Sequence, residues 1–410
     1  MKKKIISVLA VLAMLVFACG TAFSAEFSID LKGIKDTIKK DVKNAKSGKS
    51  SEGTTGTAKA AAVNTEPNSE DDFDWKVNDD FTEITITGYK GKRTDVIIPA
   101  TIQDVPVTRI EKCYGSNITS VVIPEGVKEI GKEAFDHCRG LKSVTLPAGI
   151  CIGYHAFERC EAIETVILGE NSTIGECAFE FCESLQSIEI PKGCTLKKGA
   201  FSYCRKLESV TLPEGLKIIP DKCFSVCESL ANINFPSTLK YIGRHAFGSD
   251  ESECLLTSVE LPEGLEFIGG CAFRSNAITS VSLPKSLKWV TRPYSDCYYY
   301  DIISGNNIST ITIAEGCAPK AIGGKEGDGR DIIKGASIDK SLKLQKQLAA
   351  LKLPAVADKF YSGDSKYKKN GSIKVDYNTY YLTDIGKSLY DDLLKYGFTE
   401  DEAKNILWNY

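Results

Sequence analysis

Three histidines and fifteen cysteines are the most reactive side chains of this sequence. His155 and His245 each stand just before an Ala-Phe pair, and Cys177 holds the same position one repeat after His155. Stacked repeats lie about 5 Å apart, so His155 and Cys177 could touch, and an imidazole can activate a thiol as a nucleophile. The alternative is a position that simply varies, since Glu133 and Lys222 also occupy it. We expect this position to face solvent and to serve neither catalysis nor metal binding.

The sequence lacks the common signatures of catalytic sites. It contains no His-Glu-x-x-His motif, no phosphate-binding glycine loop and no Gly-x-Ser-x-Gly turn. Glu189 and Glu260 lie three repeats apart, roughly 14 Å at the spacing of strands, whereas paired glycosidase carboxylates need about 5–10 Å. The segment after Cys317 has no histidine and no further cysteine for a nucleophile–base pair. We therefore predict a protein that is not an enzyme and that uses no cofactor.

Five cysteines share one repeat position, namely Cys138, Cys160, Cys182, Cys204 and Cys227. We expect them to point inward as small apolar side chains, as buried free cysteine does. Aligned side chains make poor disulfides because the bond needs a torsion near 90°. The absence of close Cys-x-x-Cys pairs disfavours zinc. Other cysteines could pair with one another, for example Cys151, Cys194, Cys254 and Cys297.

These positions belong to a repeat that occurs about nine times. Its pattern is L-x-x-V-x-L-P-x-x-L-x-x-I-G-x-x-A-F-x-x-C, and copies begin at Ile118, Leu141, Ile163, Leu185, Leu207, Leu230, Leu256, Ile278 and Ile308. The period of about 22 to 23 residues lies within the range of leucine-rich repeats, roughly 20–29. A single repeat cannot bury its apolar face, so neighbouring repeats must stack into a solenoid.

Each repeat predicts a strand, a corner, a second extended piece and a helical turn. In the copy at Leu207, Val210 and Leu212 alternate with Ser209 and Thr211, as in a strand with one buried side. A proline and often a glycine follow and end the strand. The outward strand positions of the other copies are also mostly polar. This polar sheet face is interpreted either as a docking surface for a protein or glycan or as an ordinary solvated face.

The run from Ile123 to Cys138 reads Ile-Pro-Glu-Gly-Val-Lys-Glu-Ile-Gly-Lys-Glu-Ala-Phe-Asp-His-Cys. This run and its copies resemble the repeats of BspA-like, or Treponema-type, leucine-rich repeat surface proteins. The resemblance covers roughly residues 73–317. It implies a right-handed solenoid with one parallel strand and a short helical turn per coil. Relatives are often adhesins, so it also implies a non-catalytic protein that binds a ligand.

Composition and pattern divide the chain into five segments. They are a signal peptide (1–25), a helical and flexible linker (26–72), an N-terminal cap with a degenerate repeat (73–117), the repeats (118–317) and a small α-rich C-terminal segment (318–410). In the last segment, helices are predicted at Asp384–Tyr396 and Glu400–Leu407, the second opened by a capping box at Thr399–Glu402.

The N-terminus predicts export, because Lys2, Lys3 and Lys4 precede an apolar run. Val16–Cys19 resembles a lipobox with Cys19 as the candidate lipidation site, whereas cleavage after Ser24 or Ala25 would release a soluble protein. Residues 27–46 place their apolar side chains on one helical face. That helix is interpreted either as lying on a lipid surface or as a solvated stalk.

The repeat at Ile278 breaks the pattern and supplies the candidate ligand-binding residues, which are Arg292, Tyr294, Tyr298, Tyr299 and Tyr300. Insertions in repeat proteins often map to the binding face, and tyrosine and arginine are enriched at binding hot spots. The alternative is that these tyrosines pack the junction with the C-terminal segment.

The net charge of −3 and the pI of about 5.9 argue against a nucleic-acid partner, which would favour a basic domain. We predict an exported protein of the cell surface, periplasm or medium that binds a protein or glycan on a host or neighbouring cell. A lipidated N-terminus would attach it to a membrane. The alternatives are an envelope structural protein without a specific ligand, or a hydrolase with its site in the C-terminal segment.

Overall fold

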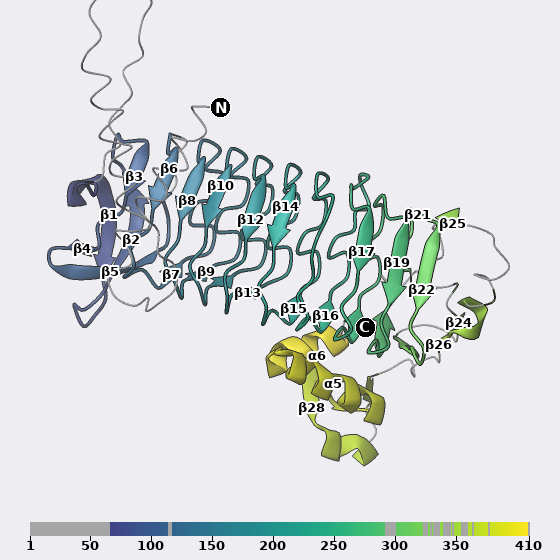
Figure 1. Ribbon diagram of the computed structural model, residues 1–410. Coiled ribbons are helices and arrows are strands. Elements are labelled where there is room, and N and C mark those ends of the chain that lie inside the picture. The colour runs from purple at the N-terminus through teal and green to yellow at the C-terminus, as the bar shows by residue number, and fades with distance from the viewer. Residues whose placement is uncertain are drawn as a thin grey trace, which may run out of the picture. The chain divides into compact units, whose positions relative to one another are not determined.

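The computed structural model describes residues 66–113, 117–291, 301–322, 327–328, 330, 337–338, 346, 348–353, 360–362, 365–375 and 378–408. These residues belong to one compact unit, Asn64–Tyr410. They form a parallel β-solenoid of about nine coils, in which one coil is one turn of the chain around the stack (Figure 1). The predicted fold class is thereby confirmed. The predicted signal peptide, Cys19 and the predicted helix over 27–46 lie outside the described residues.

Each repeat begins with a strand, and these strands together form one side of the solenoid, which we call the first face. Neighbouring strands are parallel and in register, for example Ser187 opposite Ser209 and Ser258 opposite Ser280. The strands of this face are β3 (Asp95–Ile97), β6 (Ser120–Val122), β8 (Ser143–Thr145), β10 (Thr165–Ile167), β12 (Ser187–Glu189), β14 (Ser209–Thr211), β17 (Ser258–Glu260), β19 (Ser280–Leu283) and β22 (Thr310–Ile313).

The second extended piece of each coil forms the second face, also with parallel pairing between coils. In most of these strands an isoleucine or leucine faces the core, such as Ile130 and Ile152, and the preceding residue faces outward. The strands of this face are β5 (Val105–Ile110), β7 (Glu129–Ile130), β9 (Cys151–Ile152), β11 (Thr173–Ile174), β13 (Thr195–Leu196), β15 (Ile218–Ile219), β16 (Tyr241–Ile242), β18 (Phe267–Ile268), β20 (Trp289–Thr291) and β23 (Lys320–Ile322).

The Ala-Phe-x-x-Cys segment forms consecutive turns rather than a continuous helix. In most of these turns two residues have left-handed backbone angles, as in Glu133 (φ 57°) and His137 (φ 57°). The N–H groups of Glu133, Phe135 and His137 donate to carbonyls of the next coil, while those of Ala134 and Cys138 bond within the turn. These bonds between coils offset the cost of left-handed angles in residues other than glycine, about 1–2 kcal/mol each.

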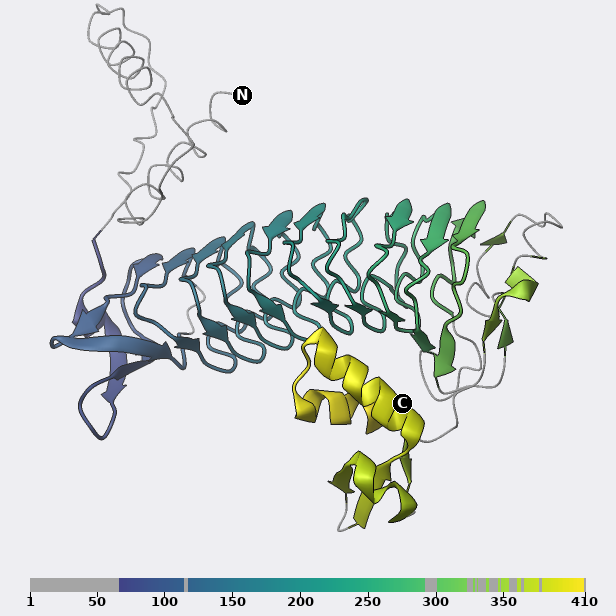
Figure 2. The ribbon, with the colours of Figure 1, turned by 60° about the horizontal axis from the view of Figure 1, so that its bottom comes forward.

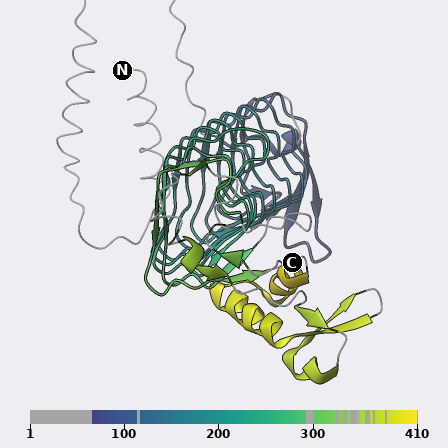
Figure 3. The same cartoon turned by 90° about the vertical axis from the view of Figure 1, so that its right-hand side faces the viewer.

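The core between the two faces contains a column of seven phenylalanine rings, one from each coil between Phe135 and Phe273. Phe157 and Phe179 stack with centroids 5.0 Å apart and planes inclined by 1°, and Phe179 and Phe201 follow at 5.4 Å. The five repeated cysteines lie beside this column and are buried, as predicted. The thiol of Cys182, for example, donates to the carbonyl oxygen of Phe157 at 3.4 Å. Figure 3 looks along the stack and shows the coils one behind another.

The first coil is covered by an antiparallel hairpin. Strands β1 (Phe73–Val77) and β2 (Ile84–Tyr89) pair antiparallel, and β2 then pairs parallel with β5. The short β4 (Thr101–Ile102) pairs antiparallel with β5, and a 3-10 helix, η1 (Glu70–Asp72), precedes β1. The hairpin satisfies the backbone groups that the first strand of the stack would otherwise leave open.

The last coils carry two small strand pairs, followed by a compact segment of residues 360–408 that we call the C-terminal module (Figure 2). The first pairs are parallel β21 (Asn307–Ile308) with β25 (Ser337–Ile338), and antiparallel β24 (Gly327–Asp328) with β26 (Lys352–Leu353). The module consists of β27 (Tyr361–Ser362), η2 (Ser365–Asn370), β28 (Ser372–Val375), β29 (Asn378–Leu382), α5 (Asp384–Tyr396) and α6 (Glu400–Trp408).

The two helices of the module begin and end at residues whose side chains or angles explain the boundary. The hydroxyl of Thr383 accepts a hydrogen bond from the N–H of Gly386, and Gly397 (φ 116°) ends α5 in a left-handed conformation. The predicted capping box is confirmed. The side-chain carboxylate of Glu402 accepts a hydrogen bond from the backbone N–H of Thr399, and the hydroxyl of Thr399 accepts one from the backbone N–H of Glu402. Among the described residues, none of the helices combines the length and apolarity that a membrane crossing requires.

Candidate functional site

The C-terminal module docks on the second face of the solenoid. The outward residue of this face is polar or small in the early coils, as in Glu129, and becomes large and apolar in the later ones. We call these later residues the apolar row: Ile218, Tyr241, Phe267 and Trp289. Tyr241, Phe267 and Trp289 are at most 2% exposed because Leu389, Leu393, Tyr396 and Leu407 of the module pack with them.

Polar contacts fix the orientation of the docked module. The indole Nε1 of Trp289 donates to Oδ2 of Asp392 at 3.0 Å, and the hydroxyl of Tyr396 donates to Oε2 of Glu266 at 3.2 Å. Burial, followed by the nearby carboxylates, raises the pKa of Tyr396 well above its ordinary value, so this phenol keeps its proton. Lys197, which directly follows β13, forms an ion pair with Glu402 of α6.

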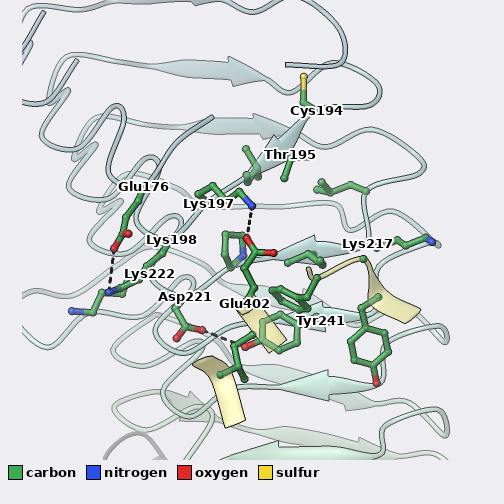
Figure 4. A pocket seen from close by; sticks show the side chains of 18 of the residues that line it. Glu176, Cys194, Thr195, Lys197, Lys198, Lys217, Asp221, Lys222, Tyr241 and Glu402 are labelled. Carbon is green, nitrogen blue, oxygen red and sulfur yellow. Dashed lines mark hydrogen bonds and ion pairs between the residues drawn. The ribbon is translucent and has the colours of Figure 1, made fainter. Parts of the chain in front are cut away.

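A cleft of about 930 Å³ lies along the edge where the module meets the second face (Figure 4). Part of its charged lining is paired: Lys198 lies 3.3 Å from Glu176, Lys197 contacts Glu402, and the hydroxyl of Tyr241 lies 3.5 Å from Oδ1 of Asp221. Lysines and arginine outnumber carboxylates in the lining, so the cleft favours a polar or anionic group.

The pKa shifts in the cleft follow from burial and from these pairs. Burial raises the pKa of Asp221, although Arg244 acts against this. Burial is the largest single influence on Glu402 and acts to raise its pKa, but the hydrogen bonds from Lys197 and Thr399 and the charge of Lys197 together hold that pKa below its ordinary value. No histidine is among the lining residues, and burial raises the pKa of the Cys194 thiol in the lining. The Cys194 thiol is therefore not an activated nucleophile.

The first face remains open to solvent along its length. Its outward side chains are exposed or half-buried and mostly carry hydroxyl, amide or carboxylate groups. They include Ser143, Thr145, Ser187, Glu189, Ser209, Thr211, Asn232, Asn234, Ser258, Glu260, Ser280, Ser282, Thr310 and Thr312. Val122, 40% exposed, and the half-buried Ile167 interrupt this polar surface, as the sequence predicts.

The candidate ligand-binding residues Arg292, Tyr294, Tyr298, Tyr299 and Tyr300 lie outside the described residues, and so does Cys19. Both ends of the segment that contains the tyrosines are described. The hydroxyl of Thr291 accepts from the N–H of Gly270, and the carbonyl oxygen of Asp301 accepts from that of Cys271. Thr291 and Asp301 therefore lie next to the start of the Ala-Phe turn that contains Gly270 and Cys271.

The structure brings His155 and Cys177 together, as the repeat register predicts, and adds Glu180, which the sequence reasoning missed. The ligand atoms of the three side chains lie within 4.8 Å of one another. Burial, followed by the hydrogen bond to Glu180, raises the pKa of Cys177 to about 12. The thiol is thus protonated near neutral pH, which argues against a thiolate nucleophile.

The expectation that His245 faces solvent is wrong. Its side chain is 3% exposed, and Asp250 of the acidic insertion that follows its turn lies 3.6 Å from its Nδ1. Burial lowers the pKa of His245 to about 4. The pairing of Cys151, Cys194 and Cys254 that the sequence left open does not occur, since each is a free thiol. Cys297 lies outside the described residues.

Comparisons with known proteins point to one family. A family model described as the BspA type leucine-rich repeat region matches six copies, over residues 109–197 and 194–317. No curated protein matches the chain.

Similar solved structures are also leucine-rich repeat proteins. One from T. pallidum is 31% identical and has a TM-score of 0.41, covering 43% of this chain and 85% of its own. One from Bacteroides ovatus is 24% identical with a TM-score of 0.49 and coverage of 66% and 76%. A leucine-rich cell surface protein from Faecalibacterium prausnitzii is 23% identical with a TM-score of 0.40 and coverage of 70% and 98%.

Proposed function

The chain belongs to the family of BspA-type leucine-rich repeat proteins, and we propose that it is an exported, non-catalytic protein that binds a ligand on a host or neighbouring cell. Leucine-rich repeat stacks are extended surfaces that mediate protein binding. The ligand is a protein or a glycan. The proposal is carried by one observation: the first face is a regularly spaced array of mostly polar, exposed or half-buried side chains that no other part of the described chain covers.

The distribution of apolar residues supports the first face over the second as the place of binding. The apolar row of the second face is already occupied by the C-terminal module. The first face presents hydroxyl and amide groups at the strand spacing, which suits hydrogen bonding to a partner backbone or to sugar hydroxyls. The segment with Arg292, Tyr298 and Tyr300 adds a second contact at the edge of the solenoid in this proposal.

Immobilised host matrix proteins and bacterial surface extracts test the proposal with the purified chain. In the variant Ser187→Lys/Ser209→Lys, two long charged side chains replace adjacent hydroxyls of β12 and β14. Binding through the first face falls at least about tenfold, which corresponds to 1.4 kcal/mol. The matched control places lysine at Thr173, an outward position of the second face away from the module. Equal binding by both variants contradicts the proposed surface.

The variant Tyr298→Ala/Tyr300→Ala tests the edge segment separately. A loss of affinity of about tenfold at an unchanged melting temperature supports ligand contact. A loss of protease resistance in the C-terminal module, with affinity retained, assigns the tyrosines to packing at the junction instead.

Export and attachment are proposed from the N-terminal sequence. Cys19 is the lipidation site in this proposal, and metabolic labelling with palmitate checks it. Label in the wild type that is lost in Cys19→Ser supports a lipoprotein. Recovery of unlabelled protein outside the cytoplasm supports a soluble exported form, and retention in the cytoplasm contradicts export.

A further inference from the structure

Three metal-ligating side chains meet on two adjacent coils. His155 comes from one Ala-Phe turn, while Cys177 and Glu180 come from the next, and left-handed angles at His155 (φ 54°) and Cys177 (φ 53°) set the two side chains in register. All three residues are half-buried, so solvent reaches them while the neighbouring coils hold their backbones. Imidazole nitrogen, thiolate sulfur and carboxylate oxygen are the ligand types of zinc.

The distances are close to those of a zinc centre. The ligand atoms lie within 4.8 Å of one another. At zinc bond lengths of about 2.0–2.3 Å, the ligand atoms of a tetrahedral site are roughly 3.5 Å apart. Small rotations of side chains that are not packed on all sides close this gap. Three protein ligands leave the fourth position for water.

Two further side chains orient the cluster. Glu158, one turn after His155, contacts Nδ1 of the imidazole and leaves Nε2 as the ligand atom. Ser202, on the following coil, donates from its hydroxyl to Oε1 of Glu180 at 2.8 Å. A carboxylate on the second nitrogen of a histidine and a hydrogen bond on a ligating carboxylate are the usual supports of a metal site.

The same solenoid contains a natural comparison for this cluster. His245 and Cys271 occupy the same two positions on a later pair of coils, also with left-handed angles. The residue equivalent to Glu180 there is Arg274, which lies 3.9 Å from the sulfur of Cys271 and 2.9 Å from Asp250. The residue equivalent to Glu158 is Gly248. A guanidinium at the ligand position repels a cation, so only the first pair has a complete ligand set.

We propose that His155, Cys177 and Glu180 form a binding site for a divalent cation of the zinc type, which ties two neighbouring coils together. The sequence alone did not predict a metal here because it did not place Glu180 beside the histidine and the cysteine. On binding, the thiol gives its proton to solvent and the sulfur forms the bond to the metal. The cation neutralises the thiolate and the Glu180 carboxylate, whose mutual repulsion opposes ionisation of the thiol in its absence.

The test uses the full chain after removal of metal with a chelator. Titration with Co²⁺ is followed by the thiolate-to-cobalt charge-transfer absorption, and Zn²⁺ is then added in competition. We expect one saturable site per chain and loss of the band as Zn²⁺ displaces Co²⁺. We also expect Zn²⁺ to raise the melting temperature of the wild type.

Four variants decide the assignment. Cys177→Ser and Glu180→Arg, the latter copying the later pair of coils, abolish the absorption band and the Zn²⁺-dependent rise in melting temperature. Glu158→Gln weakens binding by about 10-fold, as expected when the partner of a metal-bound histidine is changed. Cys151→Ser, which removes an exposed thiol outside the cluster, binds as the wild type does. Metal-free melting curves that superimpose show that the variants fold.

Two results overturn the proposal. One is a wild-type chain that shows no charge-transfer band at saturating Co²⁺. The other is a band that Cys177→Ser keeps, because the metal then binds elsewhere. Neither result bears on ligand binding by the first face, so this site and the proposed function fail independently.

Discussion

The indole of Trp289 on β20 and the carboxylate of Asp392 on α5 form a hydrogen bond of 3.0 Å inside the molecule, although 103 positions separate them in the sequence. Asp392 is 10% exposed and also lies 3.7 Å from Lys288 and 3.6 Å from Lys395. The two lysines compensate the buried charge on the side that faces solvent. This contact marks the place where the C-terminal module is joined to the solenoid.

Replacement of Asp392 by alanine tests that joint. The indole N–H of Trp289 stays buried but loses its acceptor, which costs about 1–3 kcal/mol. We expect hydrogen exchange in Asp384–Tyr396 to accelerate while the early coils keep their protection. Asp391→Ala is the matched control. The carboxylate of Asp391 is 42% exposed and forms an ion pair with Lys387 of the same helix. Equal protection in both variants would show that the hydrogen bond does not hold the module.

The phenylalanine column predicts that removing a ring at its centre lowers the stability of the fold strongly. Phe201 is fully buried between Phe179 and Phe224, with ring centroids 5.4 and 5.7 Å away. Phe201→Ala leaves a cavity and should lower the free energy of unfolding by about 3–5 kcal/mol, measured by denaturant titration. Phe81→Ala, which removes a ring that is 73% exposed, should change it by less than about 0.5 kcal/mol. A small effect at Phe201 would contradict the column.

The repeat pattern determines much of this architecture because each inward position recurs in every coil. Alternation along the strand places Val144 and its copies inward, and the recurring Ala-Phe-x-x-Cys spacing places Phe157, Cys160 and their copies. The docking of the C-terminal module was harder to foresee. The docking could have been inferred from one outward position of the second face, which changes from Thr195 in an early coil to Tyr241 in a later one. The repeat pattern allows any residue at this position.

The left-handed angles explain why the cluster at His155 was only half predicted. The spacing places Cys177 beside His155, but it says nothing of Glu180 until the turn geometry is known. Positive φ is uncommon in residues other than glycine, so the sequence does not reveal it at these positions. The burial of His245 was missed for a related reason, since it depends on how the insertion with Asp250 folds back.

His245 predicts a loss of stability in mild acid. Burial is the main cause that lowers its pKa from 6.5 to about 4; Lys222, Arg274 and Arg244 act in the same direction, and Asp250 acts against them. Between these two values the unfolded chain binds a proton that the folded chain does not, so stability falls as the pH drops from 6.5 to 4. The loss from this group is at most roughly 3 kcal/mol.

The measurement is the difference in unfolding free energy between the wild type and His245→Gln across that pH window. Asp301 acts with the opposite sign, since burial raises its pKa to about 6 and its stabilising contribution is lost as the pH rises through that value. The comparison with His245→Gln removes this background. His137→Gln, at a histidine whose side chain is 52% exposed, is the control. Parallel pH curves for the wild type and His245→Gln would contradict the prediction.

The cysteines predict a graded reactivity in the folded protein. None of the thirteen cysteines of the described residues forms a disulfide, and Cys151 is the exposed one among them. Alkylation of the native chain should therefore modify Cys151 first among these thirteen, and Cys151→Ser should remove that fast phase. Cys177 should react slowly although it is half-exposed, because its raised pKa of about 12 leaves little thiolate.

The inward cysteines should react only on unfolding. Burial raises the pKa of Cys182 well above its ordinary value, and Cys182 is also inaccessible. Peptide mapping by mass spectrometry after alkylation in and out of denaturant distinguishes the two classes. A disulfide between Cys182 and Cys204 would contradict the prediction. Such a bond would require the two aligned side chains to turn toward each other, and each sulfur would lose the contact that it makes with a carbonyl oxygen of the preceding coil.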